Sequence, residues 1–146
     1  ASLLERGMKT LHVRYERATN TASKLASWLE SHDKVKKVIY PGLESHNDYD
    51  LCKKILESPS TMVCFEVEGG DEGGRKLMDS LKTATQAVSL GGVESLISMP
   101  CSTTHVSWKK EDRLAAGIGL GFVRFSTGLE DSEDLIADFE QALNKI

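Results

Sequence analysis

One arginine stands in a segment whose neighbouring residues are typical of a buried strand. Arg124 lies between Val123 and Phe125, so the alternation of side chains along a strand places it on the opposite face from both. A guanidinium in such a segment needs a partner, because an unpaired buried charge is costly. Its planar fork can hold a carboxylate or phosphate with two parallel hydrogen bonds. Arg124 is therefore a candidate ligand-binding residue, although a structural ion pair with an acidic residue or a position facing water would also explain it.

Two further features could carry chemistry, and both have simpler explanations. Gly91 and Gly92 directly follow a predicted strand over 87–90; they permit close approach of the backbone to a ligand, or only a sharp turn. Thr104 beside His105 is a weak signal for a general base, since histidines near hydroxyls are common. Cys101 and His105 lack the second pair of ligands that a zinc site requires. We expect no metal site.

Composition excludes several classes of protein. The chain has 18 basic and 22 acidic residues, a net charge of −4, which predicts no nucleic-acid partner because such proteins carry a basic face. Its longest stretch without strongly polar residues, 115–123, is far shorter than the roughly 20 apolar residues of a membrane helix, so we expect no membrane partner. Three cysteines without a C-x-x-C motif are typical of a reducing compartment. We expect a cytoplasmic protein.

Hydrophobic periodicity predicts an α+β fold in a single domain. Apolar residues recur in steps of four and three from Leu4 to Leu29 and predict one long helix over 1–31. Over 32–146, strands are predicted at 35–40, 61–68, 87–90, 95–98 and 122–126, and helices at 45–56, after Gly69, at 110–116 and at 131–146. Without regular βαβ spacing, these elements predict one sheet with helices against one face.

Several segments, taken in order, resemble the C-terminal domain of the Cys/Met-metabolism family of pyridoxal-phosphate enzymes, which includes cystathionine γ-synthase, cystathionine γ-lyase and methionine γ-lyase. They are RGMKTL at 6–11, VIYPGLESH at 38–46, AVSLGGVESL at 87–96, TTH at 103–105 and VRFSTGLED at 123–131. The resemblance implies the small, mostly antiparallel sheet of a fold-type-I enzyme. It also implies a cytoplasmic homotetramer that acts on methionine, cystathionine or activated homoserine.

The same resemblance assigns roles to five residues. Arg124 matches the arginine that binds the substrate α-carboxylate, and Leu90 brings backbone to the same region. Ser89 matches the serine beside the lysine that carries the cofactor. Thr104 matches a residue lining the pocket, and Val88 a residue at the distal end of the substrate. Because Val88 is apolar, it favours methionine over cystathionine, whose distal ammonium would lack a partner.

The lysine motif of this family is missing from the chain. We therefore expect residues 1–146 to be the substrate-facing domain alone, with pyridoxal 5'-phosphate bound mainly by a lysine-bearing domain, and no turnover by this chain by itself. The alternative is a free-standing, non-catalytic α+β interaction domain in which Arg124 is a structural charge.

Overall fold

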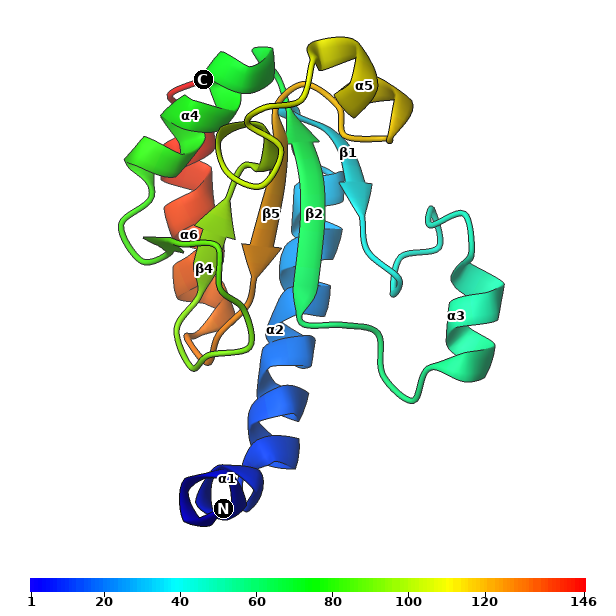
Figure 1. Ribbon diagram of the computed structural model, residues 1–146, viewed down its shortest axis with the longest axis vertical. Helices are drawn as coiled ribbons and strands as arrows, with labels where there is room; N and C mark the ends of the chain where they lie inside the picture. Colours follow the sequence, from blue (N-terminus) through cyan, green and yellow to red (C-terminus); the bar gives the residue numbers. More distant parts are fainter.

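A five-stranded sheet of order β1-β2-β5-β4-β3 lies at the centre of the protein, whose computed structural model describes residues 1–146 (Figure 1). Antiparallel pairs join β1 to β2, β2 to β5 and β5 to β4, while β3 and β4 are parallel. The sheet is thus mixed but mostly antiparallel, in agreement with the predicted α+β class. The strands are β1 (Val35–Ile39), β2 (Met62–Val67), β3 (Thr85–Gln86), β4 (Leu96–Ser98) and β5 (Phe122–Ser126).

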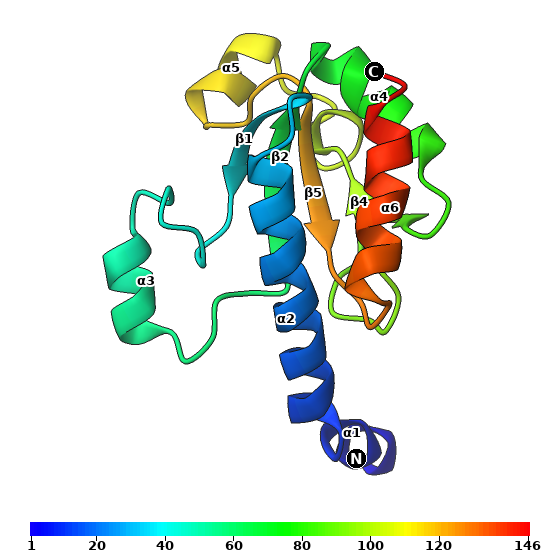
Figure 2. The same cartoon turned by 180° about the vertical axis from the view of Figure 1, so that it is seen from behind.

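Three helices cover one face of this sheet: α2 (Leu11–Glu30), α4 (Gly70–Ser80) and α6 (Ser132–Leu143). Figure 2 shows α2 and α6 in front of the strands. The core lies between these layers, where Phe139 of α6 packs its ring against Phe65 of β2 and Phe125 of β5, with ring centroids 5.9 and 5.1 Å apart. All three rings are fully buried, so α6 is held to the sheet by aromatic packing.

The segment before the sheet is two helices, not the single helix predicted over 1–31. Helix α1 (Ser2–Met8) ends before Lys9, and α2 begins after Thr10. The break is stabilised by Arg14, whose guanidinium donates to the Gly7 carbonyl at 2.8 Å and to the Thr10 hydroxyl at 3.2 Å. The side chain thereby satisfies a carbonyl that the interrupted helix leaves free.

None of the helices combines the length and apolar character needed to cross a lipid bilayer.

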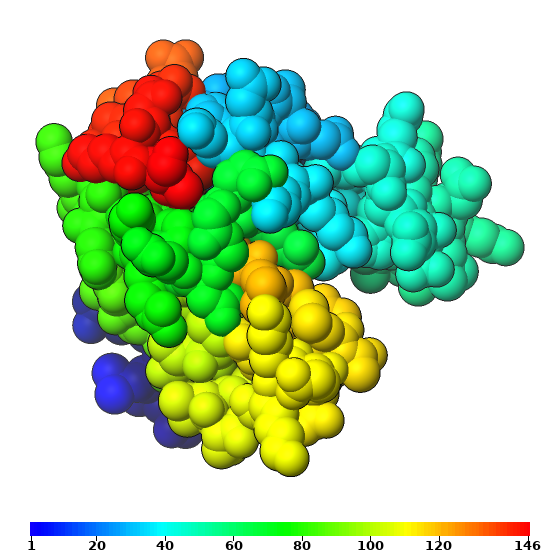
Figure 3. All heavy atoms as spheres, turned by 90° about the horizontal axis from the view of Figure 1, so that it is seen from above, coloured from blue at the N-terminus to red at the C-terminus, as the bar shows by residue number.

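Two other predicted elements are placed differently. Helix α3 (Tyr49–Ile55) begins four residues later than predicted, and Ser45 lies outside it, where its hydroxyl donates to the Glu30 carboxylate. No strand forms over the predicted 87–90; the strand before it is the two-residue β3, which pairs in parallel with β4 so that Thr85 lies opposite Leu96. Helix α3 has no buried residue, and Figure 3 shows its segment projecting from the body of the molecule.

An ion pair fixes the segment between β4 and β5. This segment contains a short 3-10 helix, η1 (Pro100–Ser102), and α5 (Lys110–Ala115). Arg113 of α5 donates to the Asp71 carboxylate of α4 at 2.9 Å, and the other carboxylate oxygen accepts from the Gly121 N–H at 2.9 Å. Burial would raise the pKa of Asp71, but these hydrogen bonds and the charge of Arg113 outweigh it and lower the pKa. Asp71 therefore joins α4, α5 and the start of β5.

Candidate functional site

The second face of the sheet, here called the open face, lies opposite α2 and α6 and points toward the viewer in Figure 1, where these two helices lie behind the strands. In β5, Val123 and Phe125 are fully buried on the helix side. Arg124 therefore lies on the open face, half-buried, as the alternation in the sequence predicts. Its register partners are Cys64 in β2 and Ser98 in β4. The arginine thus occupies the middle of the open face.

The guanidinium of Arg124 has one protein partner and one free end. Its Nη1 donates to the carbonyl of Val88 at 3.1 Å. Its Nη2 is buried and has no hydrogen-bond partner in the protein. None of the ion pairs of the structure includes Arg124. The interpretation of Arg124 as one half of a structural ion pair is therefore not supported, because no acidic residue pairs with it.

The two side chains that flank Arg124 across the strands do not neutralise it. Burial raises the pKa of the Cys64 thiol, although the nearby charge of Arg124 lowers it in part. With a raised pKa, Cys64 is a neutral thiol at neutral pH. Ser98 is a buried hydroxyl. Neither flanking side chain therefore supplies a negative charge to Arg124.

The loop after β3 brings three of the predicted site residues to this region. Val88 and Leu90 are large apolar side chains with 56% and 60% of their surface exposed, and Ser89 between them is also exposed. The loop is anchored to the sheet at its start, where the Ala87 N–H donates to the Ile97 carbonyl at 3.1 Å. Val88 contacts Arg124 through its backbone. The structure shows no hydrogen bond between Arg124 and either Ser89 or Leu90.

Thr104 lies on the loop that follows η1, and η1 contacts β5. The Thr104 hydroxyl is 2.8 Å from Nδ1 of His105, and the His105 ring stacks edge-on against Trp108 with centroids 4.6 Å apart. Thr104 is exposed and has no hydrogen bond to Arg124. The structure therefore brings Val88 to Arg124 directly, and leaves Thr104 on a neighbouring loop.

Cys64, Ser98 and Glu130 carry no signal in the sequence that would connect them with Arg124. Only the strand order β2-β5-β4 shows that Cys64 and Ser98 flank Arg124, since the three residues are far apart in the chain. Glu130 lies in the VRFSTGLED segment, but its contact with a serine 35 residues earlier becomes visible only in the fold.

These features define a class of protein: an α+β domain whose sheet carries, on the face opposite α2 and α6, an arginine outside any ion pair with one buried donor free. The chain belongs to the family of Cys/Met metabolism PLP-dependent enzymes, which it matches over residues 1–144. The resemblance inferred from the sequence is thus confirmed.

Among its curated relatives are methionine γ-lyases. The chain is 48% identical to the L-methionine gamma-lyase of Fusobacterium nucleatum subsp. polymorphum over 141 residues, which cover 97% of this chain and 36% of that protein. It is 48% identical to the L-methionine gamma-lyase of Treponema denticola over 146 residues, or 100% of this chain and 36% of that protein. The cystathionine gamma-lyase of Dictyostelium discoideum is 45% identical over 140 residues, 96% of this chain and 36% of that protein. The chain therefore spans about a third of the length of these relatives.

Proposed function

We propose that this chain is the C-terminal, substrate-facing part of a pyridoxal-phosphate enzyme that cleaves or exchanges a carbon–sulfur bond of a sulfur amino acid. Arg124 binds the α-carboxylate of that substrate. The names of the similar proteins support the reaction class, since they are methionine and cystathionine γ-lyases and a cystathionine γ-synthase. The fraction of those proteins that this chain matches supports its role as one part of the enzyme.

The observation that carries the proposal is the free, buried Nη2 of Arg124. A buried donor without an acceptor costs on the order of 1–3 kcal/mol, and more when the group is charged. A substrate carboxylate would supply the missing acceptor and the opposite charge at once. Val88 already holds Nη1 through its carbonyl, so the fork is oriented before the substrate arrives. Such preorganisation reduces the entropy that binding would otherwise cost.

We propose that the residues around Arg124 form the rim of a cofactor site. Pyridoxal phosphate supplies an electron sink for the reaction when it is bound, while protein groups orient the substrate. Around Arg124, the contacting and flanking residues are Val88, Cys64 and Ser98, none of which is the lysine that carries such a cofactor. Ser89, an exposed hydroxyl on the neighbouring loop, is the residue of this chain that we propose lies near that lysine. This chain alone would then lack turnover.

For the substrate, we propose methionine in preference to cystathionine. Val88 exposes an apolar side chain beside the arginine, and Leu90 adds a second apolar group on the same loop. An apolar wall accommodates a thioether methyl group, whereas it leaves the distal ammonium of cystathionine without a partner. Thr104, on the loop after η1, would line another side of the pocket. Turnover of both substrates by the complete enzyme, measured side by side, tests this preference.

We further propose that residues 1–31 connect the domain at 32–146 to the remainder of a cytoplasmic homotetramer. The apolar side chains of α1 and the first turns of α2 are exposed, with Leu3, Leu4, Met8 and Leu11 each at least 50% accessible. Several large exposed apolar side chains in one segment support its role as an interface. The three cysteines are free thiols, which supports a reducing compartment.

The experiment that tests the proposed function is Arg124→Ala and Arg124→Lys in the complete, cofactor-loaded enzyme, with steady-state kinetics on the amino-acid substrate. Loss of charge-assisted hydrogen bonds worth about 1.5–3 kcal/mol raises KM about 10- to 150-fold in the alanine variant. The lysine variant recovers part of the loss, because it keeps the charge but not the planar fork.

Arg75→Ala is the matched control, since Arg75 is an exposed arginine on α4 that has no contact with Arg124 among the hydrogen bonds and ion pairs of the structure. Its KM should equal that of the unmodified enzyme. Unchanged KM in Arg124→Ala would remove Arg124 from the substrate site, and with it the central part of the proposed function.

A further inference from the structure

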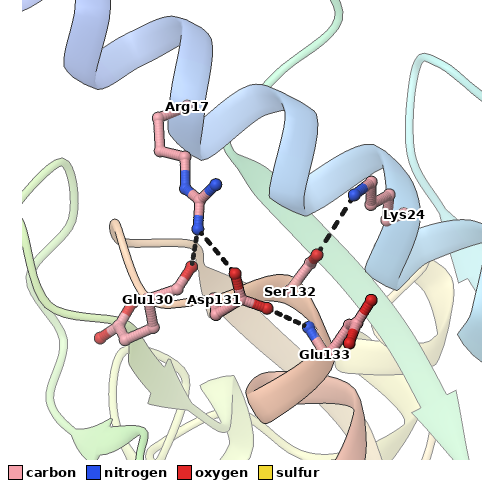
Figure 4. Close-up of polar contacts among 6 residues, drawn as sticks. All are labelled: Arg17, Lys24, Glu130, Asp131, Ser132 and Glu133. Atoms are coloured by element: carbon pink, nitrogen blue, oxygen red, sulfur yellow. Dashed lines mark hydrogen bonds and ion pairs between the residues drawn. The ribbon is translucent and has the colours of Figure 1, made fainter.

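Glu130 lies between β5 and α6, half-buried, and its carboxylate points away from α2 (Figure 4). Both of its oxygens are occupied by one residue. Oε1 accepts from the backbone N–H of Ser95 at 2.7 Å, and Oε2 accepts from the Ser95 hydroxyl at 2.7 Å. Ser95 has no exposed surface. A carboxylate with two short hydrogen bonds to one buried residue fixes that residue in position and orientation.

Ser95 ends the loop that carries Val88, Ser89 and Leu90, and the second half of this loop is fastened to the chain after Arg124. The additional hydrogen bonds between the two segments are Leu129 N–H to the Val93 carbonyl at 2.8 Å, Gly128 N–H to the Ser95 hydroxyl at 2.9 Å and Gly91 N–H to the Ser126 hydroxyl at 3.2 Å. A side chain at position 128 would meet the Val93 carbonyl, so only glycine allows this close approach. These bonds tie the loop from Gly91 to Ser95 to the segment that follows Arg124.

The other side of Glu130 is held by α2. Arg17 of that helix donates to the Glu130 carbonyl at 3.4 Å and to the Asp131 carboxylate at 3.2 Å, as Figure 4 shows. Asp131 in turn accepts from the Glu133 N–H at 2.9 Å and caps α6. The carboxylate of Glu130 thus acts from a backbone that the connecting helix and the first turn of α6 both anchor.

We propose that Glu130 is a positioning residue for substrate binding. It holds the loop through Ser95, the loop presents the Val88 carbonyl, and that carbonyl orients the Arg124 guanidinium toward the substrate carboxylate. This inference rests on the proposed function of Arg124. Removing the Glu130 carboxylate leaves two buried donors of Ser95 without an acceptor. The loop then loses two of the hydrogen bonds that anchor its end, and the Val88 carbonyl that accepts from Nη1 is held less firmly.

The test uses Glu130→Ala and Glu130→Gln in the complete, cofactor-loaded enzyme. We expect Glu130→Ala to raise KM for the amino-acid substrate about two- to thirtyfold, the usual range for residues coupled to a site through others. Glu130→Gln shows a smaller rise, because its amide oxygen still accepts from the Ser95 N–H. Glu133→Ala, an exposed glutamate on the next turn, is the control and leaves KM unchanged.

A second readout separates positioning from general stability. The inhibition constant of the decarboxylated amine analogue of the substrate is measured for each variant, since this analogue has nothing for Arg124 to bind. In Glu130→Ala it stays close to the unmodified value while KM of the amino acid rises. Amide hydrogen exchange in the loop at 88–95, followed by mass spectrometry, becomes faster in the same variant.

The outcomes distinguish this inference from the proposed function on which it rests. If Arg124→Ala raises KM and Glu130→Ala does not, the role of Glu130 is refuted and that of Arg124 stands. Equal loss of affinity for the amino acid and for the amine would show that Glu130 is merely structural, and would overturn the inference. If Arg124→Ala leaves KM unchanged, both fail. Should Glu130→Ala not fold, Glu130→Gln and Ser95→Ala carry the test with the same two readouts.

Discussion

Removing the carboxylate of Asp71 should destabilise the protein more than removing any exposed acidic side chain. The reason is that it leaves the buried guanidinium of Arg113 unpaired. Only 9% of the Arg113 side chain is exposed, against 22% of the Asp71 side chain. Breaking a buried ion pair by removing one partner costs about 3–5 kcal/mol. Since water can reach the Asp71 position in part, we expect Asp71→Ala to lower the free energy of unfolding by about 2–4 kcal/mol.

A second substitution determines how much of this cost comes from Arg113. In Asp71→Ala/Arg113→Met the unpaired charge is gone, and an apolar chain of similar length fills its place. What remains is the Gly121 N–H without its acceptor, worth about 1 kcal/mol. Equilibrium urea unfolding of the four proteins in the double-mutant cycle measures these differences.

The control for this cycle is Glu72→Ala, one residue along the same helix. Glu72 pairs with Lys76 on the surface, with 76% of its side chain exposed, so its removal should change the free energy of unfolding by less than about 0.5 kcal/mol. A double variant no more stable than Asp71→Ala would refute the explanation through the unpaired guanidinium.

Acid should remove the contribution of Asp71. Its pKa is lowered in the folded protein, so the stabilisation is fully present above the ordinary aspartate value of about 3.9. It is lost as the pH falls through the lower folded-state pKa. The difference in stability between the unmodified protein and Asp71→Asn should therefore shrink below about pH 4. A difference that stays constant between pH 6 and the acid range would contradict this reasoning.

Two further predictions concern the core and the open face. Phe139→Ala removes the ring that packs on both Phe65 and Phe125. In urea unfolding it should lower the free energy of unfolding by about 3–5 kcal/mol. A loss of less than about 1 kcal/mol would mean that the neighbouring side chains fill the space left by the ring. The pKa of Cys64 is raised by burial, so its alkylation by iodoacetamide should require a pH above the usual thiol value of about 8.5. Arg124→Ala should raise that pH further, because the guanidinium stabilises the Cys64 thiolate. The pH dependence of alkylation, followed by mass spectrometry, gives the apparent pKa of Cys64. A value below that of a free thiol would contradict this prediction.

Elements with a strong local signal were predictable from the sequence. The alternation of β5 and the acidic first turn of α6 placed these two elements within a few residues of their observed bounds. The two-residue β3 could not be predicted, because its extent depends on pairing with β4 and not on its own residues. The interruption before α2 was also missed, since it depends on the Arg14 side chain reaching the Gly7 carbonyl.

In the candidate site, too, local features were predictable from the sequence and long-range contacts were not. Arg124 could be singled out because a charge in an apolar strand is conspicuous in the sequence. Its surroundings could not, because Cys64 and Ser98 reach it only through the order of strands in the sheet. Glu130 could not be identified for a similar reason. Its contact with Ser95 joins the loop before β4 to the loop after β5. Long-range pairing, and not local preference, decides these positions.

Both rims of the sheet discourage the addition of a foreign strand. At one rim, β1 carries Lys36 and Lys37 and has an irregular register after Val35; at the other, β3 offers only two residues. Charged, kinked or very short outer strands are the means by which β-proteins avoid edge-to-edge aggregation. Oligomers of this protein should consequently form through side-chain surfaces, and its purified preparations should resist fibril growth even when concentrated.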